Sequence, residues 1–431
     1  MIDYISFFRY TRNMSSKTLV DLDQWLAPHK STIQAREKYI SSKLKTVLSG
    51  KTPAEFAMGF LHFGLHKTDV GWTFREWAPN ATRMFLVGDF SDWKERKEFA
   101  LNRDKNGEWS VNLSENSLRH GQKYKLRVYW SGGDGWRLPS YANYVVQDEN
   151  SIDFSTVVWS PKTPYDWQYK IPPKPKVPLI YEAHVGMSSQ QEKVASFSEF
   201  TAEVLPRVKE SGYNTIQLMA IAEHPYYGSF GYHVSNFFAV SSRFGTPDDF
   251  KKLVDTAHGM GLRVIIDLVH AHAAKNEVEG LGNFAGDPTQ YFKPTNHPEW
   301  DSRLFDYGKP EVLHFLASNC RWWLDEYHVD GFRFDGVTSM IYHDHGLGKS
   351  FTSYDDYFRD DVDNDALAYL RLANETIHTV RPDATTISEE MSGFPGLGAS
   401  TKDGGLGFDY RLQMGAPDLW IKTLKEKNDE D

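Results

Sequence analysis

The sequence of 431 residues contains a single cysteine, Cys320. One thiol excludes an internal disulfide and a cysteine-based zinc site. Cys320 lies in an apolar pattern typical of a helix, where a free cysteine is usually buried. The sequence therefore favours a reducing compartment, and we expect a cytoplasmic protein.

Long hydrophobic runs are also lacking. No stretch reaches the roughly 18 apolar residues that a membrane-spanning helix requires. The amino terminus has no basic region followed by an apolar core, which is the pattern of a secretory leader. These features predict a soluble protein with no membrane partner.

Positive charge is in deficit, with 48 Lys and Arg against 58 Asp and Glu and a formal charge of -10 at pH 7. This excess of negative charge repels nucleic acid and anionic lipid, so a neutral substrate is favoured. Aromatic residues, by contrast, make up 14% of the chain. Aromatic rings cover the flat C–H faces of sugars well, although most aromatic residues serve the core.

The character of the sequence changes along the chain and predicts several domains of α/β class. Residues 1–55 indicate a polar helical extension, and residues 56–170 contain short alternating runs separated by turns, which predict a β-sandwich. Residues 171–178, IPPKPKVP, hold four prolines, which disfavour helix and central strand and indicate a linker. Residues 179–431 alternate strand, loop and helix, as in a parallel sheet with crossover helices.

This last segment predicts an incomplete (β/α)8 barrel. The spacing of apolar residues predicts helices over 310–327 and about 363–380. Five candidate strands occur, whereas a closed barrel has eight. The candidate strands span residues 179–185, 215–219, 262–269, 329–334 and 384–388.

Candidate catalytic residues stand at the ends of the last two strands. VDGFRFDG carries Arg333 and Asp335, and ATTISEE carries Glu389. Side chains two apart on a strand point to one side, so Arg333 can keep Asp335 ionised as a nucleophile. Because such barrels place function at the carboxyl ends of strands, Asp335 and Glu389 are candidates for the carboxylate pair of a retaining glycoside mechanism, about 5 Å apart. Glu390 would point to the opposite face. The structural alternative is a buried ion pair of Arg333 and Asp335 with a solvated Glu389.

Two further segments carry candidate substrate-binding residues. Asp267 ends another strand and is followed by His270 and His272. These three could bind zinc, but short histidine spacings are weakly specific, so hydrogen bonding to sugar hydroxyls is favoured, with core packing open for His270. The loop EHPYYGSFGYHVSNFF can place Tyr232 against a sugar ring or can pack its own aromatic residues as a lid. We predict no metal site.

Several motifs together carry a family resemblance. DLVHAH, DGFRFDGVTSMIYHDHG, ISEEMSG and QLMAIAEHPYYGSFGYHVSNFF resemble the alpha-amylase superfamily and, within it, the eukaryotic glycogen and starch branching enzymes. GFDYRLQMGAPDLWIK supports the narrower assignment. GWTFREWAPNATRMFLVGDFSDW is similar to the glycan-binding module that precedes the barrel in those enzymes.

This resemblance implies that Asp335 is the nucleophile and that Glu389 is the general acid and base. It also implies a set of residues that contact the sugar: Tyr232, Asp267, His272 and Arg333. The implied reaction cleaves an α-1,4-glucan, holds the released segment on Asp335 and transfers it to a 6-hydroxyl, which creates an α-1,6 branch without a cofactor. The partner would be an α-glucan polymer, glycogen or starch, and the lack of a convincing transit peptide favours glycogen.

The sequence departs from the family pattern in one respect. The family has a third carboxylate in a Ser-His-Asp segment on a later strand, and this sequence contains no such segment. Loss of one preorganised interaction of this kind typically costs about 2.7 to 4 kcal/mol of transition-state stabilisation. A fragment of a branching enzyme, a catalytically incompetent glycan-binding chain and an amylase or debranching hydrolase all stay open.

Overall fold

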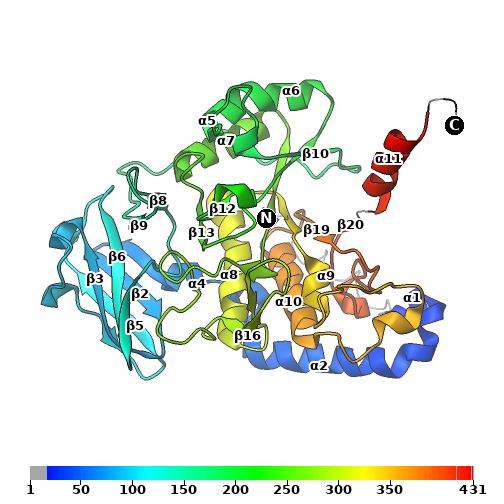
Figure 1. Cartoon of the computed structure of the whole chain (residues 1–431), viewed down its shortest axis with the longest axis horizontal. Coiled ribbons are helices and arrows are strands. Elements are labelled where there is room, and N and C mark those ends of the chain that lie inside the picture. Colours follow the sequence, from blue (N-terminus) through cyan, green and yellow to red (C-terminus); the bar gives the residue numbers. More distant parts are fainter. Residues whose placement is uncertain (1–16, 414, 429, 431) are drawn as a thin grey trace, which may run out of the picture.

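The computed structural model describes residues 17–413, 415–428 and 430. In chain order these residues form a helical segment, a β-sandwich and an α/β region built on a parallel sheet (Figure 1). The predicted fold class is therefore confirmed. The first 16 residues of the predicted helical extension lie outside the described residues.

The helical segment packs on the α/β region. It comprises η2 (Gln24–His29) and the helices α1 (Leu19–Leu22), α2 (Lys30–Leu48), α3 (Pro53–Phe56) and α4 (Gly59–His62). Arg371 of α10 (Asn364–Val380) donates to the two carboxylate oxygens of Glu37 at 2.9 and 2.6 Å. Lys43 Nζ donates to Asp365 Oδ1 at 2.5 Å. These contacts join α2 to the first half of α10.

Two antiparallel sheets form the sandwich. The first has the order β1 (Gly64–Thr68), β2 (Gly71–Trp77), β5 (Glu108–Leu113), β4 (Asn102–Arg103). The second has the order β3 (Ala81–Gly88), β6 (Lys123–Trp130), β9 (Phe154–Val157), β8 (Val145–Gln147), with β7 (Gly133–Arg137) paired to β6. Alternate side chains, such as Phe74, Met84, Leu126 and Val128, are completely buried between the sheets.

The parallel sheet is an open half-barrel. Its order is β10 (Ile180–Ala183), β11 (Thr215–Leu218), β14 (Arg263–Leu268), β18 (Gly331–Phe334), β19 (Thr385–Glu389), β20 (Tyr410–Leu412). Within the described residues it has six strands, one more than the sequence predicted. The sixth was missed because three residues are too few to show a periodic pattern.

Helices follow the strands as expected. They are α6 (Leu205–Glu210), α7 (Pro247–Gly259), α8 (Pro310–Tyr327), α9 (Val337–Ile341) and α10. The helix predicted over 310–327 coincides with α8, and its apolar residues Leu316 and Leu324 are completely buried. The remaining short helices are η3 (Asp89–Ser91), η4 (Lys97–Phe99), η5 (Glu115–Ser117), η6 (Val185–Met187), α5 (Phe197–Glu199), η7 (Phe200–Val204), η8 (Tyr227–Ser229), η9 (Tyr354–Tyr357) and η10 (Thr401–Asp403).

Long connections after the strands carry secondary structure of their own. β12 (Ala222–Glu223) pairs with β13 (Asn236–Val240) after β11. After β14, the strands β15 (His272–Ala273), β17 (Arg303–Phe305) and β16 (Phe292–Asn296) form a small antiparallel sheet. These connections leave the carboxyl ends of the parallel strands, where barrels place their functional residues.

The helix α11 (Gly415–Glu426) lies apart from the rest of the chain in Figure 1. Its apolar side chains Leu419, Trp420 and Leu424 are 65%, 66% and 77% exposed. Neither α11 nor any other described helix combines the length and apolar character needed to cross a membrane.

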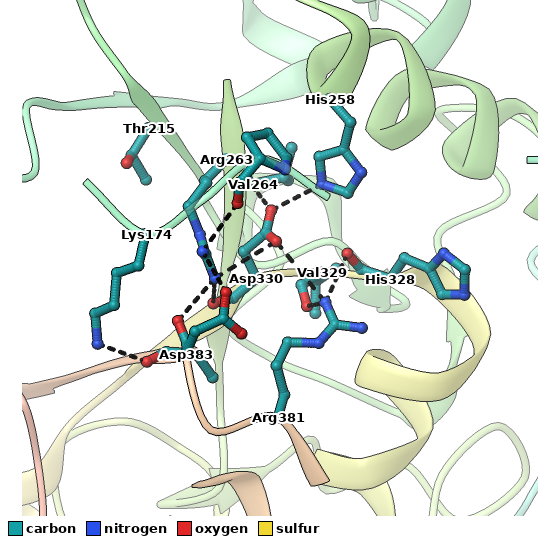
Figure 2. A network of polar contacts seen from close by, with 12 residues as sticks. Lys174, Thr215, His258, Arg263, Val264, His328, Val329, Asp330, Arg381 and Asp383 are labelled. Carbon is teal, nitrogen blue, oxygen red and sulfur yellow. Dashed lines mark hydrogen bonds and ion pairs between the residues drawn. The ribbon is translucent and has the colours of Figure 1, made fainter. Parts of the chain in front are cut away.

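A buried ionic network joins the amino ends of β14, β18 and β19 (Figure 2). Asp330 Oδ2 accepts from the Val264 amide at 2.7 Å and lies 2.9 Å from His258 Nε2. Arg263 Nη1 donates to Asp383 Oδ2 at 2.9 Å, and its Nη2 lies 3.6 Å from Asp330 Oδ1. The network fixes the starts of three neighbouring strands, so their carboxyl ends meet in a defined register.

Candidate active site

The carboxyl ends of β14, β18 and β19 bring together four ionisable residues. Asp267 on β14 is in register with Arg333 on β18. Asp335 follows the last residue of β18, and Glu389 is the last residue of β19. Asp267 and Glu389, 122 positions apart in the sequence, therefore share one site because β14 and β19 both neighbour β18.

Arg333 is the centre of this cluster. Its Nη1 donates to Asp335 Oδ1 at 2.8 Å and to Asp267 Oδ2 at 3.0 Å, and its Nη2 lies 3.0 Å from Glu389 Oε1. Only 8% of the Arg333 side chain is exposed. As the strand alternation predicts, Arg333 and Asp335 share one pocket. Glu389 contacts the same guanidinium and is therefore not the separate, solvated residue of the structural alternative.

The two outer carboxyls, Asp335 and Glu389, are coupled. Burial raises the pKa of both, and Arg333 opposes this in both. A hydrogen bond between the two side chains lowers the pKa of Asp335, and it raises the pKa of Glu389. Burial thus favours one proton on the pair over two full negative charges. Arg333 draws the two carboxyls together.

Asp267 lies beneath the other two acids and is 4% exposed. Its Oδ1 accepts from Gln217 Nε2 at 2.8 Å, and its Oδ2 accepts from the Tyr232 hydroxyl at 2.6 Å. Burial raises the pKa of Asp267 to about 7, in spite of the charge of Arg333 and the Tyr232 hydrogen bond. Tyr232 is thereby held over the cluster, with the Arg333 Cζ atom 5.9 Å from its ring centroid.

His272 borders the same site. Its Nε2 is 2.8 Å from the Tyr232 carbonyl oxygen, so this nitrogen carries the proton and donates. Burial lowers the pKa of His272 to about 4, which keeps the ring neutral near pH 7. Nδ1 is then an acceptor, and it is buried without a hydrogen-bond partner among the described residues.

A cleft of about 730 Å³ opens over the cluster. Asp335 and Glu389 line it, and Asp267 and Arg333 lie behind them. Its walls carry aromatic and other apolar side chains together with His272: Tyr226, Tyr232, Trp300 and Met391. A cleft that combines rings with two carboxyls has the composition expected of a sugar-binding site.

The tandem acids Glu389 and Glu390 point to different places, as predicted. Glu390 is completely buried and accepts from the amides of Ser392, Gly393 and Phe394 at 2.8, 2.8 and 3.2 Å. It therefore holds the turn after β19 and does not reach the cleft.

His270 is not grouped with Asp267 and His272. Its Nδ1 hydrogen-bonds the Tyr369 hydroxyl, and its Nε2 hydrogen-bonds Asn319 Oδ1 at 2.9 Å. Both ring nitrogens hydrogen-bond side chains of helices, so His270 serves core packing, the alternative that the sequence left open for this residue.

Three contributors to the site were not found from the sequence. Gln217 supports Asp267, and the Gly336 amide donates to Glu389 Oε2 at 2.9 Å. Trp300 forms part of the wall beside His272, with ring centroids 5.0 Å apart. The inward position of Gln217 on a strand was a usable signal, whereas the other two depend on loop conformation.

Two segments of the chain match known families. Residues 62–142 match carbohydrate-binding module 48, the isoamylase N-terminal domain, and residues 201–280 match the alpha amylase catalytic domain. The first segment lies in the sandwich region, and the second runs from η7 past the small strand β15.

Relatives extend the similarity to almost the whole chain. The 1,4-alpha-glucan-branching enzyme of Yarrowia lipolytica is 47% identical over 95% of this chain and 62% of its own length. The branching enzyme of Dictyostelium discoideum is 46% identical over 98% of this chain and 63% of its own length. That of Solanum tuberosum is 47% identical over 96% of this chain and 50% of its own length. The chain thus spans between half and 63% of the length of these curated relatives.

Solved structures share the fold. The catalytic module of the glycogen-degrading pneumococcal virulence factor SpuA has a TM-score of 0.60 at 18% identity, over 76% of this chain and 50% of that one. The pullulanase of Bacillus acidopullulyticus also has a TM-score of 0.60, at 20% identity, over 76% of this chain and 41% of its own.

The chain is thus similar to the alpha-amylase superfamily, with a segment similar to carbohydrate-binding module 48 before the segment similar to the alpha amylase catalytic domain. Within that class, the resemblance to the 1,4-alpha-glucan-branching enzymes is confirmed, at 46–47% identity over at least 95% of the chain.

Proposed function

We propose that this protein is a glucan-branching glycosyltransferase, which cleaves an α-1,4 linkage and forms an α-1,6 branch through a covalent intermediate on Asp335. The observation that carries the proposal is the cluster in which Arg333 contacts Asp267, Asp335 and Glu389 at the base of the cleft. The similarity to branching enzymes supports transfer to a sugar hydroxyl over hydrolysis.

In the first half of the reaction, an Asp335 carboxylate oxygen attacks the anomeric carbon. The bond from that carbon to the 4-oxygen of the next glucose breaks, and the proton of Glu389 passes to this oxygen. This step requires an ionised Asp335 and a protonated Glu389, that is, one proton on the pair, which the burial of the two acids supports.

In the second half, the ionised Glu389 removes the proton from a 6-hydroxyl of a glucan chain. The 6-oxygen attacks the anomeric carbon, and the bond to Asp335 breaks. Glu389 is protonated again and Asp335 is free, so the cycle consumes no cofactor.

We further assign sugar binding to Tyr232, Asp267, His272 and Arg333. The unpartnered Nδ1 of His272 supports a hydrogen bond from a sugar hydroxyl. The Tyr232 ring lines the cleft and can stack on the sugar next to Asp335. Glycogen synthesis in the cytoplasm is the proposed setting, which the buried single thiol of Cys320 supports.

A second candidate is glycan binding without chemistry. The observation that favours it is the match of residues 62–142 to carbohydrate-binding module 48. A hydrolase of the amylase or debranching type would use the same carboxylate pair, so product linkage has to distinguish hydrolysis from transfer.

Intact-protein mass spectrometry with α-maltosyl fluoride tests the proposal. Fluoride departs without an acid, so Glu389→Gln is expected to accumulate one maltosyl unit on Asp335, and the double variant with Asp335→Asn is expected to gain none. Asp301→Asn, which alters an exposed acid of the same cleft, is the matched control and should not prevent labelling in the Glu389→Gln background.

Failure of Glu389→Gln to gain mass would exclude the transferase for this chain, and retention on amylose would then support binding alone. Wild-type protein incubated with amylose should produce α-1,6 linkages by NMR. Free maltooligosaccharides without new branches would indicate the hydrolase.

A further inference from the structure

One loop supplies much of the cleft wall. This cleft loop, residues 224–235, connects β12 to β13 and contributes Tyr226 and Tyr232 to the cleft. Its two ends meet at Glu223, whose carbonyl oxygen accepts from the Ser235 amide at 2.9 Å. In its middle, Gly231 has φ 92°, and a Cβ there would lie 1.9 Å from the Ala220 carbonyl oxygen. The loop is therefore tightly seated on the end of β11.

The Glu223 side chain anchors the base of the loop. It is completely buried, and its Oε1 accepts from the His224 amide and the Ser241 hydroxyl, both at 3.0 Å. Its Oε2 accepts from the amide and the hydroxyl of Ser242, both at 2.8 Å. A buried carboxylate with this many donors is a fixed point of the structure.

Arg243 connects this anchor to the first residues of the loop. Its Nη1 lies 3.4 Å from Glu223 Oε1 and donates to the His224 carbonyl oxygen. Its Nη2 donates to the Pro225 carbonyl oxygen at 2.9 Å and to Gln147 Oε1 at 3.2 Å. The planar guanidinium holds all these oxygens at once, which a lysine amine cannot do.

Gln147 belongs to the sandwich, so this contact crosses between domains. It ends β8, and Phe154 of the adjacent β9 lies under Arg243, with Cζ 5.8 Å from the ring centroid. Phe154 and Val145 also share a buried apolar cluster with Ala239 of β13. Figure 1 shows β8 and β9 beside β12 and β13.

We propose that Glu223, Arg243 and Gln147, here called the loop clamp, position the cleft loop for the reaction, so that the sandwich is part of the active-site scaffold. Arg243 touches no reacting atom and is a positioning residue. It binds the carbonyl oxygens of residues 224 and 225 at the start of the loop. Further along the same loop, the Tyr232 hydroxyl donates to Asp267. The inference rests on the proposed function, because it concerns how well the cleft receives a glucan.

The test measures the labelling of Asp335 by α-maltosyl fluoride in the Glu389→Gln background, as both a maximal rate and a half-saturating concentration. Arg243→Ala is expected to reduce the ratio of rate to half-saturating concentration by about 10²-fold, because misplacement of about 1 Å has effects of this size. Arg243→Lys should recover part of the loss, and Gln147→Ala should reduce the ratio about two- to tenfold.

Arg371→Ala is the matched control, since Arg371 also joins a carboxylate to backbone carbonyls, at Glu37, Gly404 and Gly405. It should lower stability and leave labelling constants unchanged. Hydrogen exchange should rise in residues 224–235 in the Arg243 and Gln147 variants and stay unchanged there in Arg371→Ala.

Each result decides a separate question. No labelling with Arg243 intact would overturn the proposed function. Normal labelling by Arg243→Lys and Gln147→Ala, or an equal loss in Arg371→Ala, would overturn the loop clamp even if Arg243→Ala fails to fold.

Discussion

Replacing Asp267 by Asn should make the protein more stable near pH 8 while impairing its proposed chemistry. Burial raises the pKa of Asp267 from 3.8 to about 7. The folded state therefore holds a proton that the unfolded state releases between these pH values. Stability from this group is complete below about pH 3.8 and is lost as pH rises through about 7.

The size of the effect follows from the two pKa values. At about 1.4 kcal/mol per pKa unit, the interval from 3.8 to about 7 corresponds to about 4 kcal/mol. Asparagine has no charge to desolvate, and its amide can still hydrogen-bond Gln217 and Tyr232. We therefore expect Asp267→Asn to exceed the wild type in unfolding free energy at pH 8 by up to about 4 kcal/mol, and to match it within about 1 kcal/mol at pH 4.

Urea unfolding of both proteins at pH 4, 6 and 8 measures this difference. Other buried acids, such as Glu76 with a pKa raised to about 7 by burial, affect both proteins and cancel from the comparison. A variant that is less stable than the wild type at pH 8, or a difference that does not change with pH, would refute the assignment of burial as the dominant influence on Asp267.

Three other substitutions test neighbouring parts of the argument. Asp330→Asn removes the completely buried acid that Arg263 and Arg381 share and should lower the unfolding free energy by about 3–5 kcal/mol in urea, so an unchanged midpoint would contradict a structural role for the network. Tyr232→Phe keeps the ring but removes the hydroxyl that donates at 2.6 Å, and thermal unfolding should show a loss of about 1–3 kcal/mol. Gly231→Ala forces a Cβ to within 1.9 Å of a carbonyl oxygen at φ 92°, so proteolysis of the cleft loop should accelerate at least about tenfold, and wild-type resistance would show that the loop is not tightly seated.

Local periodicity accounts for the part of the fold that the sequence predicted. α8 repeats its apolar residues over five turns, and a sandwich strand such as β2 alternates buried and partly buried residues, so each element carries its own signal. β20 has three residues and forms only by pairing with β19, which no local pattern reveals.

Part of the candidate site could likewise be predicted from local patterns, and part could not. Strand alternation was enough to place Arg333 and Asp335 on one side and to separate Glu389 from Glu390, and the structure has this arrangement. Their catalytic roles stay predictions. His270 could not be distinguished from His272 by spacing, because what differs is the partner of each ring: a helix side chain, Asn319, for His270 and a loop carbonyl, that of Tyr232, for His272.

Long-range polar contacts lay beyond the sequence altogether. Arg243 meets Gln147 across 96 positions, and the Gly336 amide meets Glu389 across 53. Such contacts are set by how domains and loops pack, so they become visible only in three dimensions.

The sharing of Arg333 by three acids has a consequence for titration experiments. A proton gained at any one of Asp267, Asp335 or Glu389 changes the field felt by the other two, so an inflection in a rate-against-pH curve describes the group of microstates and not a single side chain. Substituting one acid would move the inflections that remain. Carboxyl-carbon NMR titrations of singly substituted proteins, compared with one another, can separate the protonation of the three acids.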